Sequence, residues 1–515
     1  MVSLSCFAAA TQPVEQWGIF EVTLKGPTNG NPFLDVLLSA RFYQDESAFN
    51  CAGFYDGDGE YRIRFMPDRP GRWRYITRSN RPELETTNEF VALAPSRTNR
   101  GPVYVTNTFH FAYADGTPYK QIGTTCYAWT HQSNELQEQT LNTLASSPFN
   151  KIRFCIFPKR YDWNTNEPSL YPFAGTPPRD WDKTRFNPQF FRHLELRIAN
   201  LRDLGIEADI ILFHPYDEGH WGFDRMTALE DERYLRYVVS RLSSFRNVWW
   251  SLANEYDFMK EKREADFERF GQLISAIDPC HRLLSIHNGR ELFNQTLPWL
   301  THASIQNGSA VEDAGRAVLY RDVYRKPIVF DEAKYEGNIP KRWGNISAEE
   351  MVFRFWQGTI AGTYVGHGET YLDPSDVLWW SRGGVLRGQS PPRLAFLRRV
   401  LEDGPPEGIE PIDKWQNPQY GGRPGVYYLV FLGKEQPTSW EFKLPKPPQG
   451  KGLGLENEMR FKAEVLDTWN MTVTPVEGVF TLKKKTDYFY GDEQNRSIPL
   501  PGKPYMAIRI KRVSE

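Results

Sequence analysis

The chain has 515 residues, a formal net charge of -2, 40% hydrophobic residues and 24% charged residues. These values exclude a single small domain, a disordered chain and a membrane-spanning protein. The 62 basic residues are balanced by 64 acidic residues, so no positive field favours nucleic acid or an anionic membrane as a partner. The same balance favours an uncharged or small partner. Aromatic residues make up 14% of the chain, which favours a ligand with a flat apolar face.

Residues 1–100 alternate apolar and polar side chains with a period near two. The alternating runs cover residues 17–24, 33–38, 61–65 and 73–77, and glycine, proline, asparagine and aspartate separate them. This pattern predicts an N-terminal antiparallel β-sandwich of the immunoglobulin or fibronectin type. A segment rich in proline and glycine, residues 95–102, is expected to link it to the next domain.

Residues 101–403 contain short apolar runs, each expected to precede an amphipathic helix. The eight runs are 119–125, 151–157, 207–213, 248–254, 283–287, 303–306, 327–331 and 362–366. Eight strand and helix alternations predict a closed parallel (β/α)8 TIM barrel, an α/β fold. No GxGxxG or Walker sequence is present, so an open nucleotide-binding sheet is disfavoured and no cofactor is expected.

Residues 404–515 return to strand patterning after a stretch dominated by proline and glycine. Apolar runs at 427–432, 440–444, 461–466 and 505–510 predict a second antiparallel β-sandwich. We expect the two flanking domains to shield the barrel or to mediate formation of a homo-oligomer, rather than to bind glycan.

The five cysteines, Cys6, Cys51, Cys126, Cys155 and Cys280, are scattered and form no CxxC pair. They predict free thiols in a reducing compartment. The first ten residues are small and apolar, but they lack a basic start and the apolar stretch is short for an export signal. We therefore expect a cytoplasmic protein, or a secreted one if a signal has been removed.

Two glutamates stand where predicted barrel strands end. The fourth run is followed by Glu255 and the seventh by Glu332. Because the carboxyl ends of barrel strands surround one pocket, the two carboxylates are expected to face each other from opposite walls. Cleavage of an acetal bond needs one protonated and one ionised carboxyl group, and repulsion across about 5 Å keeps their pKa values apart. The alternative is that each is a buried acid paired with an arginine such as Arg153.

Three stretches in barrel order, 249–257, 329–338 and 366–370, resemble the apiosidase-like branch of the clan A retaining glycoside hydrolases. The resemblance implies a (β/α)8 barrel with flanking β-sandwiches and a carbohydrate substrate. It also implies that Glu255 is the general acid/base, that Glu332 is the nucleophile, and that Asn254 binds the sugar 2-hydroxyl.

Other polar and aromatic residues near the strand ends are candidates for binding a hydroxyl-rich ligand. With Asn254, the predicted substrate-binding residues are Trp129, Arg153, His214, His287, Gln306, Tyr335, His367, Glu369 and Trp379. Each has an alternative role as a satisfied core residue, and Arg153 has a further one in keeping Glu332 ionised. The tandem Trp379-Trp380 is either a wall that stacks on a sugar ring or packing beneath a loop.

A catalytic metal is not expected. The segment from His214 to His220 holds two histidines and two acids, but the chain has neither an HxH after its first strand nor an HExxH motif. The expected activity is therefore that of a retaining glycosidase that acts from a chain end on plant or microbial glycans or glycosides. Two alternatives stay open: an inverting glycosidase on the same barrel, and a carbohydrate-binding protein without catalysis.

Overall fold

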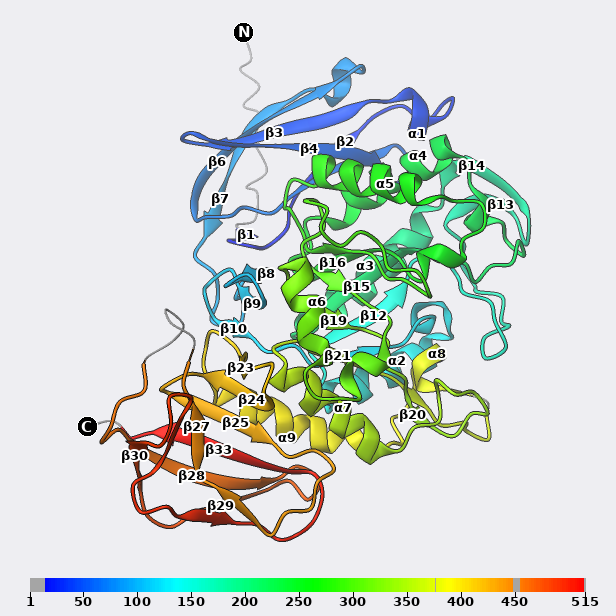
Figure 1. Ribbon diagram of the computed structural model, residues 1–515. Helices are drawn as coiled ribbons and strands as arrows, with labels where there is room; N and C mark the ends of the chain where they lie inside the picture. Colours follow the sequence, from blue (N-terminus) through cyan, green and yellow to red (C-terminus); the bar gives the residue numbers. More distant parts are fainter. Residues whose placement is uncertain (1–13, 376, 448–453, 514–515) are drawn as a thin grey trace.

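The structure, a computed structural model, describes residues 14–375, 377–447 and 454–513. Cys6 and the segment 1–10, on which the expectation about export rests, lie outside the described residues. Figure 1 shows an N-terminal β domain, a central barrel and a C-terminal β domain. The α/β fold with a central (β/α)8 barrel and antiparallel sheets on both sides is thereby confirmed.

The N-terminal domain is one seven-stranded sheet that curls over on itself. Its strands are β1 (Val14–Glu15), β2 (Phe20–Lys25), β3 (Leu38–Gln44), β4 (Ser47–Tyr55), β5 (Glu60–Phe65), β6 (Gly71–Ser79) and β7 (Thr87–Leu93), in the order β1-β7-β6-β3-β4-β5-β2. The ring of Phe20 in β2 stacks on Phe90 in β7 with centroids 3.6 Å apart, although these strands lie near opposite edges. The alternating apolar side chains thus form an enclosed core.

The central barrel has eight parallel strands. They are β11 (Gly123–Thr125), β12 (Lys151–Cys155), β15 (Glu207–Phe213), β16 (Val248–Ala253), β17 (Leu284–Ser285), β18 (Ala303–Ser304), β19 (Ile328–Phe330) and β21 (Tyr364–His367). A parallel bridge between His287 and Ser304 joins the two ends of the sheet and closes the barrel. Seven strands lie within the apolar runs predicted from the sequence, and β21 extends one residue beyond the eighth run.

Helices cover the barrel, but not after every strand. They are α2 (Asn134–Ala145), α3 (Pro188–Asp203), α4 (Ala228–Leu242), α5 (Glu264–Ile277), α6 (Arg316–Tyr324), α7 (Ala348–Ile360), α8 (Trp379–Arg382) and α9 (Ser390–Glu402). The expectation of a helix after the fifth strand is wrong, because residues 286–302 contain no helix. Gly289 and Pro298 disfavour one there. Trp299 instead packs against Gly271 of α5 and covers this part of the barrel.

The amino ends of the barrel strands are closed by a small sheet. It consists of β8 (Val103–Thr106), β9 (His110–Tyr113) and β10 (Pro118–Tyr119). The Phe111 ring packs against Trp249 and Tyr364, at centroid distances of 5.1 and 5.2 Å. Further strand pairs lie in the loops beyond the carboxyl ends: β13 (Phe173–Thr176) with β14 (Asp180–Phe186), and β20 (Glu336–Gly337) with β22 (Glu369–Thr370).

The C-terminal domain is built on a nine-stranded antiparallel sheet with its own core. Its strands are β23 (Glu410–Asp413), β24 (Asn417–Arg423), β25 (Tyr427–Phe431), β27 (Lys443–Pro445), β28 (Arg460–Asp467), β29 (Thr472–Pro475), β30 (Phe480–Lys484), β31 (Phe489–Asp492) and β33 (Met506–Arg512), and β26 (Ser439–Glu441) pairs with β32 (Ser497–Pro499). Phe431 of β25 stacks on Trp356 of α7 at 5.5 Å, which fixes this domain on the barrel.

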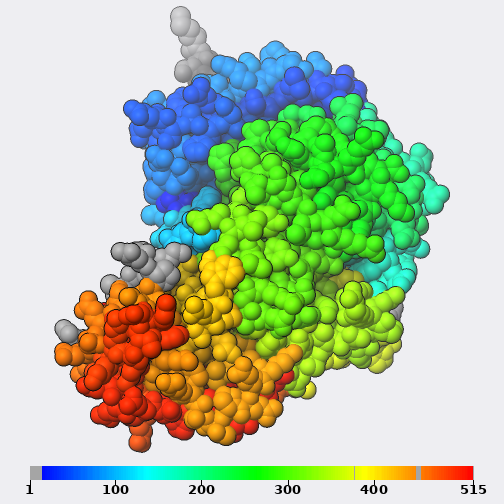
Figure 2. Space-filling model, in the orientation of Figure 1, coloured from blue at the N-terminus to red at the C-terminus, as the bar shows by residue number. Residues whose placement is uncertain are grey.

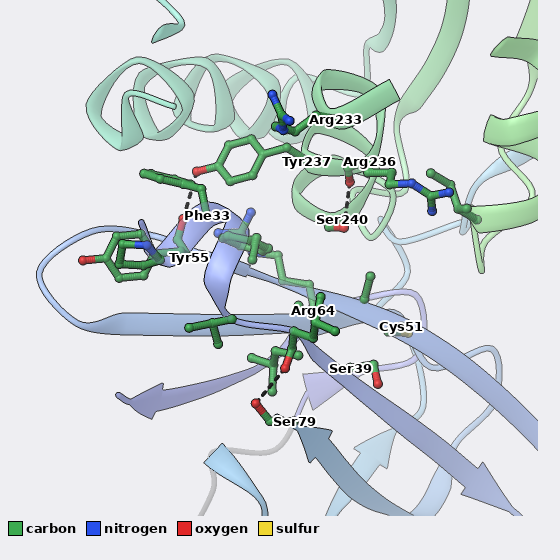
Figure 3. A pocket seen from close by; sticks show the side chains of 18 of the residues that line it. Phe33, Ser39, Cys51, Tyr55, Arg64, Ser79, Arg233, Arg236, Tyr237 and Ser240 are labelled. Atoms are coloured by element: carbon green, nitrogen blue, oxygen red, sulfur yellow. Dashed lines mark hydrogen bonds between the residues drawn. The ribbon is translucent and has the colours of Figure 1, made fainter. Parts of the chain in front are cut away.

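The N-terminal domain packs closely on the barrel (Figure 2). Buried ion pairs lie at this contact. Arg241 of α4 binds Asp56 at 2.7 Å and Glu195 of α3 at 2.6 Å, and Arg64 of β5 donates to Glu195 at 3.0 Å. A groove of 740 Å³ lies along this junction, between α4 and the N-terminal strands (Figure 3). Within the described residues, no helix is both long and apolar enough to cross a lipid bilayer.

Candidate active site

A cavity of 730 Å³ lies at the carboxyl end of the barrel and contains both predicted catalytic glutamates in its lining. Glu255 follows β16 and Glu332 follows β19, so they reach the cavity from the fourth and the seventh strand. Glu255 is 6% exposed, and the side chain of Glu332 is 11% exposed. The backbone of Glu255 has φ of 49°, a left-handed conformation that is uncommon outside glycine and is often found at functional sites.

Glu332 lies beside a hydroxyl donor and a cation. Oε1 of Glu332 accepts a hydrogen bond from the Tyr127 hydroxyl. The same oxygen lies 3.7 Å from Nη1 of Arg153, which is fully buried. A permanent positive charge and a hydrogen-bond donor both stabilise a carboxylate, which suits an attacking group.

Arg153 also fixes the wall next to Glu332. Its guanidinium donates to Oδ1 of Asn254 at 2.5 Å and to the Ser251 hydroxyl at 3.1 Å. The Asn254 amide therefore has its nitrogen side free to face Glu255, whose Oε2 lies 3.4 Å from Nδ2. One planar guanidinium thus sets the positions of residues on the second, fourth and seventh strands.

Glu255 has the opposite electrostatic environment. Burial raises the pKa of Glu255 to about 8, and the negative charge of Glu332 adds to the effect. With its amide oriented to donate, Gln306 places its nitrogen 2.9 Å from Oε1 of Glu255 and 3.1 Å from the Asn288 carbonyl. Glu255 is therefore largely protonated near neutral pH, as a proton donor must be.

A chain of buried polar groups supports the cavity floor. Asp331 accepts from the Ser304 hydroxyl at 2.5 Å and pairs with Lys151 at 2.9 Å, so it points into the barrel and away from the cavity. Nδ1 of His287 lies 2.9 Å from Ser304 Oγ. Since the Ser304 proton is used on Asp331, Nδ1 of His287 must donate to Ser304. Burial and the charge of Arg153 lower the pKa of His287 well below its ordinary value, so Nε2, 3.7 Å from Glu332, carries no proton.

The structure brings some of the other predicted binding residues to the cavity. Gln306 and Tyr335 line it, and Asn254, Arg153 and His287 contact the two glutamates or approach them from behind the wall. These five come from the second, fourth, fifth, sixth and seventh strands or from the residues that follow them.

The remaining five predicted residues lie outside the cavity lining. Trp129 is fully buried and packs edge-on against Phe154. His214 approaches the Phe157 carbonyl at 3.2 Å and accepts from the Tyr216 amide at 3.1 Å, and burial lowers its pKa to about 3. Both side chains have partners within the fold.

His367, Glu369 and Trp379 are also held by the fold itself. His367 approaches Thr124 at 3.0 Å, and the Trp379 indole donates to the same hydroxyl at 2.9 Å. Glu369 accepts from the backbone amides of residues 387 and 388 at 2.5 and 2.7 Å, so it anchors the loop before α9. Trp380, the neighbour of Trp379, is the member of the tandem that lines the cavity.

Several aromatic residues and the buried lysine that line the cavity were not predicted. They are Tyr127, Lys159, Tyr161, Trp163, Tyr216 and Trp343. Tyr127 lies only two residues beyond β11, so its position next to a strand end could have identified it as a residue of the cavity. The others stand in loops after β12, β15 and β19, whose paths the pattern of strands and helices does not determine.

Among the described residues, no group of three or more histidine, cysteine, aspartate or glutamate side chains could hold a metal ion. Asp217, between the two histidines of the 214–220 segment, accepts from the backbone amides of Trp221 and Phe223, both at 2.6 Å. Cys51, Cys126, Cys155 and Cys280 are free and buried. The lining of the cavity offers carboxylates, amides, aromatic hydroxyls and cations, among them Lys159.

The family of this chain is identified from the sequence of its barrel. A sequence model of the apiosidase-like catalytic domain matches residues 106–384. The chain belongs to the apiosidase-like family of glycoside hydrolases. In this apiosidase-like protein, residues 13–80 and 415–511 match two domains of unknown function, DUF5060 and DUF5605. No curated protein matches the sequence.

Solved structures share the architecture of this apiosidase-like protein. A candidate glycoside hydrolase from Bacteroides vulgatus ATCC 8482 is 41% identical, with 97% of this chain and 100% of that chain covered and a TM-score of 0.94. A glycoside hydrolase family 5 protein from the same organism is 15% identical, with 80% and 93% covered and a TM-score of 0.54, and shares the fold. The predicted apiosidase-like barrel is confirmed.

Proposed function

We propose that this glycoside hydrolase retains the anomeric configuration, with Glu332 as nucleophile and Glu255 as general acid/base. The observation that carries the proposal is the contrast between the two carboxyl groups that line one cavity. Glu332 lies beside Arg153 and the Tyr127 hydroxyl, whereas burial and the charge of Glu332 raise the pKa of Glu255 to about 8. Two acids with such different environments suit the two roles in double displacement.

In the first step, a carboxylate oxygen of Glu332 attacks the anomeric carbon and the glycosidic C–O bond breaks. Glu255 gives its proton to the departing oxygen, so the leaving group departs as a neutral alcohol and a glycosyl ester on Glu332 forms. Loss of this proton leaves Glu255 ionised at the moment when esterification removes the charge of Glu332. The mutual repulsion that raises the pKa of Glu255 is thereby relieved.

In the second step, ionised Glu255 takes a proton from a water molecule, and the water oxygen attacks the anomeric carbon. The ester bond breaks, Glu332 leaves as a carboxylate, and a sugar with the original anomeric configuration is released. The Tyr127 donor and the Arg153 charge stabilise Glu332 as a leaving group. Acid/base assistance of this kind contributes roughly 10²- to 10⁴-fold to the rate.

The cavity supports action at a chain end on plant or microbial glycans or glycosides. Loops after β12, β15, β19 and β21 supply its walls, with Tyr161, Tyr216, Trp343 and Trp380 among the lining residues. A volume of 730 Å³ lies within the usual range of cavities that enclose a small ligand. Asn254, held by Arg153 beside Glu255, is proposed to bind the sugar 2-hydroxyl.

The stereochemistry of the first product tests the proposal. Proton NMR of a reaction with an activated aryl glycoside should first show the sugar with the anomeric configuration of the substrate. The opposite anomer as first product would establish the inverting alternative, in which the carboxyl groups lie about 6.5 to 9.5 Å apart. Binding of sugars without turnover of any aryl glycoside would favour the alternative of a non-catalytic carbohydrate-binding protein.

A further inference from the structure

Lys159 differs from the other buried lysines of the described chain. Lys151 and Lys262 each have a carboxylate partner, with Lys151 2.7 Å from Asp209 and Lys262 2.6 Å from Asp231. Lys159 is 2% exposed, yet its Nζ forms no hydrogen bond and no ion pair with any described residue. Enclosing most of an ammonium group without a partner is costly, because its N–H donors lose part of their hydration.

Aromatic rings surround this ammonium group. Nζ of Lys159 lies 3.5 Å from the ring centroid of Tyr127, 4.0 Å from Tyr216 and 4.6 Å from Tyr161, and the ring of Trp380 is 5.1 Å away. Contacts between a cation and aromatic faces are favourable. They attract the charge but accept none of its N–H groups in an ordinary hydrogen bond, so the three donors stay available.

The position of Lys159 is fixed by the loop that carries it. The Lys159 carbonyl accepts from Nδ2 of Asn164 at 2.6 Å, and Oδ1 of Asn164 accepts from Gln132 at 3.1 Å. A two-way backbone contact between Tyr161 and Asn164 closes the same turn. The cation and its rings therefore form a preorganised unit after β12.

This unit belongs to the catalytic cavity. Lys159, Tyr127, Tyr161, Tyr216 and Trp380 all line the space that contains Glu255 and Glu332. The charges of the two glutamates favour the protonated form of Lys159, but neither glutamate forms an ion pair with it. A positive group in this place is therefore available to a bound molecule.

We propose that Lys159 binds an anionic substituent, a carboxylate or a sulfate, on the sugar that occupies the catalytic cavity. The substrate is then an acidic glycan or glycoside rather than a neutral one. Charge-assisted hydrogen bonds from Nζ would replace the missing protein partner, and the aromatic faces would pack against the apolar faces of the ring. This inference rests on the proposed function for the identity of the cavity, but it concerns binding and not turnover.

Binding of matched sugar pairs, measured by calorimetry, tests the proposal. The probes are D-glucuronate and D-galacturonate against their methyl esters, and glucose 6-sulfate against glucose. We expect at least one charged sugar to bind about tenfold more tightly than its neutral partner, a difference of about 1.4 kcal/mol. The uronate and sulfate pairs show which anion the cavity accepts.

Variants assign the preference to the ammonium group. In Lys159→Met and Lys159→Gln, the ratio of the affinity for a charged sugar to that for its neutral partner should be close to one. Lys159→Arg should keep a preference for the charged sugar. Lys341→Met is the matched control, because Lys341 lines the same cavity but is exposed, and most of the preference should remain. Thermal unfolding of each variant shows whether it is folded.

Three results would overturn the proposal. They are equal affinity for charged and neutral partners in the unsubstituted protein, no binding of any charged probe, and a preference that survives in a folded Lys159→Met or Lys159→Gln variant. Because binding is measured without turnover, the outcome is independent of the retaining mechanism. A Lys159-dependent preference in a protein that hydrolyses nothing would support this inference and contradict the proposed function.

Discussion

Nη1 of Arg153 lies 3.7 Å from Oε1 of Glu332, and both groups are almost completely enclosed by protein. The arginine stands on the second barrel strand and the glutamate follows the seventh, so the contact spans the barrel mouth. Arg153 also binds Asn254 and Ser251 through the same guanidinium. Its charge and its planar shape therefore both contribute to the arrangement of the site.

Replacement of Arg153 should show that catalysis needs the planar guanidinium group in addition to its charge. Arg153→Lys keeps a positive charge near Glu332 but cannot contact Asn254 and Ser251 at once. We expect kcat/KM to fall by about 10²-fold, the range found when one preorganised donor is lost. Steady-state kinetics on an activated aryl glycoside measures the change. If the kcat/KM of Arg153→Lys stayed within twofold of the wild-type value, the geometry of the guanidinium group would contribute nothing to catalysis.

Removal of the proton donor should be repaired by a small anion. Glu255→Ala leaves Glu332 able to attack, but no group can then activate water for the second step. Azide can attack the glycosyl ester directly, so we expect it to restore turnover of an activated aryl glycoside and to yield a glycosyl azide with the substrate's configuration. Glu332→Gln is the control variant, and azide should not restore its activity. If azide restored the activity of Glu332→Gln and not that of Glu255→Ala, Glu255 would be the nucleophile and Glu332 the acid/base.

The pH dependence should follow the protonation of Glu255. Its pKa is raised to about 8, so the acid form persists at neutral pH and is lost as the pH rises through this value. We expect the alkaline limb of kcat/KM to have its midpoint near pH 8.

The pKa of Lys159 is lowered to about 8 by burial, so this residue titrates in the same range. The two origins of the alkaline limb can be separated in Lys159→Met. Loss of the nearby positive charge should move a limb caused by Glu255 to higher pH. A limb that disappears in this variant would assign the titration to Lys159 and contradict the prediction.

The raised pKa of Glu255 should also cost stability at alkaline pH. The folded value of about 8 exceeds the ordinary value of 4.5, so folding holds a proton that the unfolded chain releases. The wild-type protein should therefore lose stability as the pH rises from about 4.5 to 8, and Glu255→Gln should lose less, because other buried acids with raised pKa values, such as Glu369, remain in the variant. Across this interval the free energy of unfolding of the variant should rise by about 2 kcal/mol relative to that of the wild type. This figure is reduced from the full pKa difference because the titration of Glu255 is coupled to Glu332.

Thermal or denaturant unfolding at pH 5 and pH 8 provides the comparison. Glu369→Gln is a useful control, because its carboxyl group also has a raised pKa, about 7, but accepts two backbone hydrogen bonds. Glutamine can accept only one of these bonds, so that variant should be less stable at both pH values. Equal effects of Glu255→Gln at pH 5 and pH 8 would contradict the predicted linkage.

The strands and the catalytic pair could be predicted because their signals are local. An apolar run that ends in Asn254-Glu255 identifies both a barrel strand and the residue at its open end. The missing helix after β17 could not be predicted in this way, since Trp299 fills the space by a tertiary contact with Gly271.

The lining of the cavity was harder to predict because neighbouring residues point in different directions. Trp379 and Trp380 are adjacent, yet Trp379 donates to Thr124 in the core and Trp380 lines the cavity. His367 and Glu369 stand at the end of a strand but are held by Thr124 and by the loop before α9. Lys159 lies four residues beyond β12, where only the folded loop shows that it faces the glutamates.

The central claim is that Glu332 forms a covalent bond to the sugar, and mechanism-based labelling tests it most directly. The protein would be treated with a 2-deoxy-2-fluoro glycosyl fluoride of a sugar whose aryl glycoside it hydrolyses, digested, and examined by mass spectrometry. The account predicts loss of activity with one fluoro-sugar on the peptide that contains Glu332, and no label in Glu332→Gln. A label on the peptide that contains Glu255, or full activity with no label, would contradict it.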